Sequence, residues 1–449
     1  MTQIQREVLT VVKERAILAA CLLPDHNIDP HDPLGELRAL VDTAGAIIVD
    51  ELMQKRQKPD SATFIGKGKT KELAQLVEIH EADVVIFDND LTPSQIGNLE
   101  QNIECKVLDR SELILDIFAA RARSHEAKLQ VELAQLEYTY PRLRAMWTHL
   151  ERIVGGAPTG IGTRGPGEQQ LEIDRRIVQR RKADLKRQIH RIQQRKAREV
   201  QARNQDFFTV GLVGYTNAGK STLFNIATET SGGGGAYADK KLFATLSTRT
   251  RKWNLGGCST VMLSDTVGFV RDLPHHLVAS FKATLEEAIH SDLLLIVLDV
   301  SHPRAREQLQ IVFKVLDEIG VTTQERLIAL NKIDKLAHNA DLLVFQQEFP
   351  TAVPISAKTG LGMEPLIERI RLASRGELRE LKITMNSGDG KAISFLESRS
   401  EVLQRHYTTD TLTLTVRIGT RWLGQIKAMG TSAQICKEAE EIEKKGWGR

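Results

Sequence analysis

The 449-residue sequence predicts a multidomain α/β fold that contains one long helical hairpin. Short apolar runs of strand length alternate with helical patterns before residue 123 and again after residue 204, which is typical of α/β domains. Between them, residues 123–204 show two long helical patterns around a Gly-rich loop. A chain of this length corresponds to roughly three domains, and its 41% hydrophobic content is enough for each to form a core.

The N-terminal region, residues 6–121, contains four apolar runs separated by helical segments. The expected strands lie at 16–23, 46–51, 84–88 and 106–108. Strands that alternate with helices in this way build a largely parallel sheet. We therefore expect a small α/β domain here, and no cluster of catalytic residues is visible in its sequence.

Two helices with matching apolar faces are predicted next. The first carries Leu129, Leu133, Leu136, Tyr140, Leu143, Trp147 and Leu150, and the second carries Ile177, Leu185, Ile189, Ile192 and Val200. Because these side chains recur near three- or four-residue steps, the helices are expected to pack as an antiparallel pair. Pro141 lies within the first set and should kink or divide that helix.

The second helix is strongly basic. Residues 174–203 hold 12 Lys and Arg against 3 Asp and Glu, a local excess of +9, so the rest of the chain sums to −6 for a net charge of +3. A charge run is usually a solvated surface. This imbalance is too large for ordinary pairing within helices, so it favours contact with a polyanion such as nucleic acid.

The loop between the helices, residues 155–168, is longer than most helix connections and contains six Gly, two Pro and Arg164. Such a loop is either a flexible linker or an element that inserts into a partner. Gly allows close backbone approach, and the Arg164 guanidinium can bind phosphate or stack on bases, so we favour insertion into structured RNA. The expected RNA-binding residues are Gly162, Thr163, Arg164, Gly165, Arg175, Arg176, Arg180 and Arg181.

The third region begins with an apolar run at 207–213, followed by the spacing G-x-x-x-x-G-K-S. Its Gly residues let the backbone wrap around phosphates, while N–H groups and the positive end of the next helix face them. Lys220 would reach the β- and γ-phosphates, and the Ser221 hydroxyl would bind Mg²⁺. The expected nucleotide-binding residues of this loop are Gly214, Tyr215, Thr216, Asn217, Ala218, Gly219, Lys220, Ser221 and Thr222.

Three further segments follow in the order that a guanine nucleotide site needs, each after an apolar run. Asp265 is expected to hold Mg²⁺ through a water, and the Gly268 N–H to face the γ-phosphate. Asp334 can accept hydrogen bonds from the guanine N1–H and amino group, which adenine does not present. The expected residues are Asp265, Thr266, Val267, Gly268, Asn331, Lys332, Ile333, Asp334, Ser356, Ala357 and Lys358, and the last three supply N–H groups to the guanine O6. Together these segments predict a P-loop GTPase domain.

The loop that responds to the γ-phosphate has little pattern of its own. Its expected residues are Phe243, Ala244, Thr245 and Leu246, which follow a Gly run and precede the Asp265 segment. The Thr245 hydroxyl is the candidate for a Mg²⁺ ligand that binds only when a γ-phosphate is present. Thr248 and Thr250 are rivals for this role.

The residue after Gly268 is Phe269, where many GTPases place a Gln that orients the attacking water. An apolar side chain cannot do so. We therefore expect slow intrinsic hydrolysis of GTP, with the water positioned by another group, a cation or a partner. The residues expected to take part in catalysis are Lys220, Thr245 and Gly268.

The C-terminal region is expected to form a small α/β module. Strands are predicted near 381–385 and 412–418, with a helix between 391 and 406 and a Lys-rich helix at the end. The four Cys residues of the chain stand far apart, without a C-x-x-C pair, which indicates neither a zinc site nor disulfides and fits a reducing cytosol. No apolar run is long enough to cross a bilayer.

These motifs resemble those of the HflX family of ribosome-associated GTPases, in the Obg-HflX branch. The most specific evidence is Gly-Thr-Arg-Gly-Pro-Gly-Glu at 162–168, then Leu171-Glu172 and Asp174-Arg175-Arg176, joined to the phosphate loop at 214–221. The resemblance implies binding to the large ribosomal subunit, with the Gly-rich loop near the peptidyl transferase centre. It also implies splitting of stalled ribosomes under stress, Thr245 as a Mg²⁺ ligand, and K⁺ as a further ligand through Asn217.

We therefore expect a GTP-hydrolysing switch that binds guanine nucleotides, Mg²⁺ and the rRNA of the large (50S) ribosomal subunit. The expected domains are 1–122 (α/β), 123–204 (basic hairpin), 205–374 (GTPase) and 375–449 (small α/β). A GTPase of ribosome assembly and a regulatory module for a protein or membrane partner are the alternatives. We expect a cytoplasmic monomer, with a peripheral position at a membrane as an option.

Overall fold

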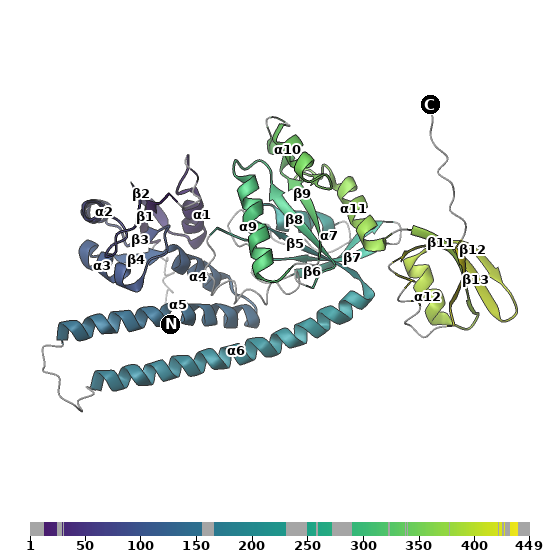
Figure 1. Cartoon of the computed structure of the whole chain (residues 1–449), viewed down its shortest axis with the longest axis horizontal. Coiled ribbons are helices and arrows are strands. Elements are labelled where there is room, and N and C mark those ends of the chain that lie inside the picture. Colours follow the sequence, from purple (N-terminus) through teal and green to yellow (C-terminus); the bar gives the residue numbers. More distant parts are fainter. Residues whose placement is uncertain are drawn as a thin grey trace, which may run out of the picture.

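The computed structural model describes most of the chain and resolves it into three α/β units and a long hairpin (Figure 1). The described residues are 13–24, 29, 31–154, 166–229, 249–256, 259–271, 290–321, 324–336, 338, 340–376, 378–420, 422–423, 426 and 432–438, without the side chains of 141–154, 166–174, 199–206, 341 and 436–438. Within this part of the chain, no helix is both long and apolar enough for a bilayer.

The N-terminal unit is a parallel four-stranded sheet in the order β2-β1-β3-β4. Its strands are β1 (Arg15–Leu22), β2 (Ile47–Lys55), β3 (Val84–Phe87) and β4 (Lys106–Asp109), and its helices are α1 (Gly35–Ala44), α2 (Lys67–His80), α3 (Pro93–Ile103) and α4 (Arg110–Arg121). Separate cores fill the two faces, with α1 and α4 on one and α2 and α3 on the other. The predicted parallel α/β arrangement is confirmed.

The hairpin consists of α5 (His125–Val154) and α6 (Pro166–Asp206), which run antiparallel below the N-terminal and central units (Figure 1). At 41 residues, α6 is roughly 60 Å long. Leu129 and Leu133 of α5 pack against Leu185 and Ile189 of α6, as the apolar pattern predicted.

Two details of the predicted hairpin need comment. Pro141 was expected to kink or divide the first helix, and the division is excluded because α5 is continuous from His125 to Val154. Ile177 is 58% exposed instead of buried, and its neighbour Val178 is half-buried. The reason is helical geometry. A packed helix returns to the same face after seven residues, so the residue that shares a face with Leu185 one heptad earlier is Val178 and not Ile177.

The central unit is a six-stranded sheet in the order β10-β9-β8-β5-β7-β6, in which β6 alone is antiparallel to its neighbour. Its elements are β5 (Phe208–Gly214), α7 (Lys220–Glu229), β6 (Arg249–Gly256), β7 (Ser259–Asp265), β8 (Leu293–Asp299), α9 (Ala305–Glu318), β9 (Glu325–Asn331), the 3-10 turn η1 (Ile333–Lys335), α10 (Ala340–Glu348), β10 (Val353–Pro354) and α11 (Met363–Arg375). Helices α7 and α11 cover one face, and α9 and α10 cover the other.

The C-terminal unit is an antiparallel sheet in the order β12-β13-β11-β14 with one face covered by α12. Its elements are β11 (Leu378–Asn386), α12 (Gly390–Arg399), β12 (Glu401–Tyr407), β13 (Thr411–Gly419) and β14 (Gln434–Glu438). The helix expected up to residue 406 ends at Arg399, because the following residues pair with β13. Residues 434–438 form a strand on β11 where a terminal helix was expected, and residues 439–449 lie outside the described part.

The hairpin is joined to both neighbouring units. Ala127, Val131 and Ala134 of α5 belong to the core of the N-terminal unit, and the Tyr138 hydroxyl donates a hydrogen bond to the Asp109 carboxylate. At the other end, α6 is separated from β5 by a single residue. A movement between the N-terminal and central units therefore acts on opposite legs of the hairpin.

Candidate nucleotide site

The predicted nucleotide motifs meet at the carboxyl edge of the central sheet. The segments that follow β5, β7, β9 and β10 are far apart in sequence, but parallel pairing places the ends of these strands at one edge. This is the edge where open parallel sheets bind ligands.

The phosphate loop follows β5 and needs Gly at two positions. At Gly214, φ is +150°, and a side-chain carbon would lie 2.3 Å from the Val297 carbonyl oxygen. At Gly219, φ is +97°, and a side-chain carbon would lie 2.3 Å from Nδ2 of Asn331. Both positions exclude a side chain, so the loop can close tightly onto the neighbouring strands.

Lys220, at the start of α7, is buried and held by the loop that it follows. Its Nζ donates hydrogen bonds to the carbonyl oxygens of Gly214 (3.0 Å) and Tyr215 (2.7 Å). Burial lowers the pKa of Lys220 to about 8, although the Asp265 carboxylate opposes the shift; Lys332 adds to it. The amino group of Lys220 is thus already positioned against the phosphate loop. The negative charge of a bound polyphosphate would raise its pKa again.

Ser221 and Asp265 form the predicted metal-binding pair. The Ser221 hydroxyl donates to Oδ2 of Asp265 at 2.9 Å, and Asp265 is buried at the end of β7. Among the residues placed by the structure, no three His, Cys, Asp or Glu side chains form a metal-binding group. Mg²⁺ commonly takes one or two protein ligands and completes its shell with phosphate oxygens and water, and this hydroxyl–carboxylate pair fits that chemistry.

Asn331 joins the phosphate loop to the segment after β10. Its Nδ2 donates to the Ala218 carbonyl at 2.7 Å, and its Oδ1 accepts from the Ala357 N–H at 2.9 Å. All three residues are buried. Because one amide side chain holds both loops, the parts expected to bind phosphate and base cannot move independently.

Lys332 contacts the phosphate loop, and Asp334 contacts the segment after β10. Lys332 Nζ donates to the Asn217 carbonyl at 2.7 Å and to Asp299 at 2.5 Å. Asp334 is exposed, and its Oδ1 accepts from the Ser356 hydroxyl at 2.6 Å. This hydrogen bond lowers the pKa of Asp334, which keeps its carboxylate ionised as an acceptor.

The segment after Asp265 also contacts the phosphate loop. The Phe269 N–H donates to the Gly214 carbonyl at 3.1 Å, and the Thr216 N–H donates to the Phe269 carbonyl at 2.7 Å. A side-chain carbon at Gly268 would lie 2.9 Å from Lys220 Nζ. Gly268 therefore lies directly beside Lys220, the lysine that is predicted to bind phosphate.

Some predicted residues lie outside the described part of the chain. They are Phe243, Ala244, Thr245, Leu246 and Thr248 of the switch loop, and Gly162, Thr163, Arg164 and Gly165 of the hairpin loop. Thr250, the other rival, lies in β6, where its hydroxyl is 2.9 Å from that of Ser264.

The basic residues of α6 have two kinds of surroundings. Arg175, Arg176 and Arg180 are exposed. Arg181 is exposed as well, and it forms two hydrogen bonds with Glu132 of α5, at 2.6 and 2.7 Å. The acids that pair with this side of α6 thus come from the other helix. Further pairs of this kind are Lys186 with Glu137 and Lys196 with Glu126.

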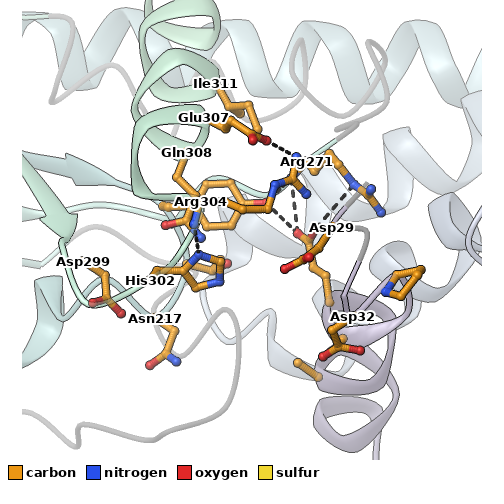
Figure 2. Close-up of a pocket in the computed structure, with 16 residues that line it drawn as sticks. Asp29, Asp32, Asn217, Arg271, Asp299, His302, Arg304, Glu307, Gln308 and Ile311 are labelled. Carbon is orange, nitrogen blue, oxygen red and sulfur yellow. Dashed lines mark hydrogen bonds and ion pairs between the residues drawn. The ribbon is translucent and has the colours of Figure 1, made fainter. Parts of the chain in front are cut away.

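The sequence pattern missed four charged residues next to the site: Glu36, Asp88 and Arg110 of the N-terminal unit and Arg271 of the central unit. They are joined by ion pairs of 2.7 to 3.5 Å. A cavity of about 280 Å³ lies beside them, where the two units meet next to Asn217 (Figure 2). No local motif could reveal these residues, because their partners are far apart in the chain.

This fold and this arrangement of motifs define a P-loop GTPase. Three family models match the chain: a GTP-binding GTPase N-terminal region at 31–119, a GTP-binding GTPase middle region at 121–203 and a 50S ribosome-binding GTPase at 209–332. Chains named GTPase HflX from Magnetococcus marinus and Escherichia coli are 41% and 43% identical to it. The first match covers 96% of this chain and 97% of the relative, and the second covers 83% and 85%.

The chain belongs to the HflX family of GTPases, and it hydrolyses GTP. Among solved structures, it is similar to a GTP-binding protein from the hyperthermophilic archaeon Sulfolobus solfataricus in complex with GDP. That match is 26% identical, has a TM-score of 0.43 and covers 80% of this chain and 98% of the other.

Proposed function

We propose that this chain is a GTP-driven switch that binds the large (50S) ribosomal subunit and separates stalled ribosomes under stress. In this proposal it acts in the cytoplasm as a monomer, and it contacts rRNA through α6 and residues 155–168. The observation that carries the proposal is the basic face of α6 near this loop, where Arg175, Arg176 and Arg180 are exposed. The description of the matching family model as a 50S ribosome-binding GTPase supports the same partner.

In the proposed nucleotide complex, the phosphates lie against Lys220 and the N–H groups of the phosphate loop. Ser221 and Asp265 hold Mg²⁺ together with Thr245, and Gly268 donates its N–H to the γ-phosphate. The buried Lys220 and the existing Ser221–Asp265 hydrogen bond support these roles, because little rearrangement is needed to bind.

The proposed base contacts explain the preference for guanine. The ionised Asp334 carboxylate accepts hydrogen bonds from N1–H and the amino group, and the loop of Ser356, Ala357 and Lys358 supplies N–H groups to O6. Asn217 is the proposed residue for K⁺. It lies exposed at the turn of the loop, where its φ is +59°.

Intrinsic hydrolysis is proposed to be slow because Phe269 cannot orient water. Its side chain is 2% exposed and packs with Val213, Leu298 and Leu309 in the core between the sheet and α9. A polar group from elsewhere must therefore position the attacking water, and the ribosome is the proposed source of that stimulation.

The test is sedimentation of the full-length protein with purified ribosomes in the presence of GTP, GDP or a non-hydrolysable GTP analogue. We expect the analogue to favour cosedimentation with 50S subunits. The triple substitution of Arg175, Arg176 and Arg180 to Ala should reduce it. The matched control replaces Arg306, Lys314 and Arg369, three exposed basic residues of α9 and α11, with Ala and changes the net charge equally.

Other outcomes separate the alternatives. Equal loss of binding in both triple variants would mean that only net charge matters, and would contradict the assignment to α6. Cosedimentation with precursor subunits in place of mature ones would indicate ribosome assembly. Binding to anionic vesicles or to a protein, without any binding to ribosomal particles, would indicate a regulatory module.

A further inference from the structure

A group of four charged residues and one Tyr connects the N-terminal unit to the predicted nucleotide site. We call it the interdomain cluster; it consists of Glu36, Asp88, Arg110, Tyr215 and Arg271. Arg110 is 1% exposed, Asp88, Tyr215 and Arg271 are 6 to 7% exposed, and Glu36 is half-buried. Charges buried to this extent are normally paired, and the two carboxylates and two guanidinium groups here balance one another.

On the side of the N-terminal unit, the two carboxylates organise the cluster. Asp88, just after β3, accepts hydrogen bonds from Arg110 at 2.7 Å and from Arg271 at 2.8 Å. Glu36, in the first turn of α1, lies 3.0 Å from Arg110 and accepts a hydrogen bond from the Tyr215 hydroxyl at 2.7 Å. Burial raises the pKa of Glu36, but the Arg110 and Arg271 cations outweigh it, so the pKa is lowered.

On the side of the GTPase domain, both members of the cluster belong to the nucleotide machinery. Tyr215 is the second residue of the phosphate loop, and Arg271 comes three residues after Gly268. The Arg271 N–H donates to the Tyr215 hydroxyl at 2.8 Å, so this hydroxyl links Glu36 to the backbone that follows Gly268. Figure 2 shows Arg271 and Asn217 among the residues that line one pocket.

Packing reinforces these polar contacts. Val267 and Val270, on either side of Gly268 and Phe269, are buried in the core of the N-terminal unit. Gly268 thus lies between two residues packed on one unit, while Phe269 is hydrogen-bonded to the phosphate loop of the other. The position of the Gly268 N–H therefore depends on both units.

We infer that Tyr215 and Arg271 are positioning residues, which hold the Gly268 segment in place for a γ-phosphate only when Glu36 and Asp88 of the N-terminal unit complete the cluster. The N-terminal unit is thus part of the device that distinguishes GTP from GDP. This inference does not depend on the ribosome as partner.

The physical consequence is a selective effect on nucleotide affinity. GTP needs the Gly268 N–H at its γ-phosphate, whereas GDP has no γ-phosphate and makes no such contact. Loosening the Gly268 segment therefore weakens binding of the triphosphate but not of the diphosphate. By reciprocity, binding of the triphosphate must strengthen the contact between the two units.

The experiment measures the affinity of full-length variants for GDP and for a non-hydrolysable GTP analogue by calorimetry. We expect Tyr215→Phe and Arg271→Met each to lower the affinity for the analogue by at least about fivefold, which is the lower end of typical coupling between sites. GDP affinity should stay within about twofold, which is smaller than that coupling. Arg271→Lys should restore part of the loss, because the cation returns without the planar fork. The matched control is Arg306→Met, which removes an exposed Arg paired with Glu348 at 2.8 Å.

If these residues served only folding, the affinities for GDP and for the analogue would fall equally. That result would overturn the inference, and so would unchanged affinities for both nucleotides. If Arg271→Met does not fold, the same affinity measurements on Tyr215→Phe and Asp88→Asn test the inference. Each of these substitutions removes hydrogen bonds while keeping the shape of the side chain. A second measurement is hydrogen exchange in α1. Exchange there should be slower with the analogue than with GDP in the wild type, and the difference should disappear in Tyr215→Phe.

Discussion

Replacing Asn331 with Ala tests whether one side chain holds the two nucleotide loops together. The substitution removes the hydrogen bond to the Ala218 carbonyl and the one from the Ala357 N–H. Both groups are buried, and a buried polar group without its partner costs about 1–3 kcal/mol. The expected loss of stability is therefore about 2–6 kcal/mol for the two groups together.

Thermal unfolding of the GTPase domain, followed with and without GDP, measures this loss. In a domain of this size, 1 kcal/mol lowers the midpoint by about 2–4 °C, so a drop of at least about 4 °C is expected. The affinity for GDP should also fall by at least about tenfold, since about 1.4 kcal/mol is enough for that change. The Asn102→Ala control removes an exposed Asn of α3 whose side chain donates to the Asn98 carbonyl of the same helix, and should change neither quantity.

A second substitution at this position separates loss of contact from wrong contact. Asn331→Asp keeps an acceptor for the Ala357 N–H but turns a carboxylate oxygen toward the Ala218 carbonyl. We expect it to be at least as damaging as Ala. Wild-type midpoints and GDP affinity in both variants would refute the claim that Asn331 joins the loops.

Three further predictions concern charge. The pKa of Lys220 is lowered to about 8, and bound phosphates should raise it again, so GDP binding should take up close to one proton at pH 9 and almost none at pH 7. Calorimetry in buffers of different ionisation enthalpy measures this uptake, and an equal uptake at both pH values would contradict the assignment. Asp334→Asn should lower the affinity for GDP by at least about 100-fold, because two charge-assisted hydrogen bonds are lost. The same variant should bind xanthosine diphosphate more tightly than GDP, because the second carbonyl of xanthine accepts a hydrogen bond from the new amide. Measured affinities for both nucleotides check this, and unchanged guanine selectivity would refute it. For the Ala substitutions at Arg175, Arg176 and Arg180, the salt dependence of rRNA binding should become shallower by roughly two to three units of slope, and an unchanged slope would exclude phosphate contacts there.

The nucleotide site was largely predictable from sequence because each of its segments is local. The phosphate loop needs Gly214 and Gly219 at set distances from Lys220, so its pattern survives in any chain that builds it. The same holds for the alternation of strands and helices in the N-terminal unit, since apolar runs of strand length report burial directly. What the local pattern cannot supply is the register of remote pairings.

The predictions that were wrong failed because they depend on pairing between segments that are far apart in the chain. Residues 401–407 read as the continuation of a helix, and they become β12 because pairing with β13 outweighs their local preference. Residues 434–438 become β14 by pairing with β11, about 50 residues earlier in the chain. Arg181 likewise finds Glu132 only because the hairpin folds back on itself.

By itself, the sequence determined that this protein binds and hydrolyses a guanine nucleotide, because short segments of backbone and side chain carry that chemistry wherever the sheet places them. Only the tertiary structure decided that the N-terminal unit contacts the phosphate loop and the segment after Gly268. Tyr215 and Arg271 meet Glu36 and Asp88 across separations of more than 170 residues, and side-chain contacts at such separations arise from the packing of two folded units rather than from any pattern along the chain.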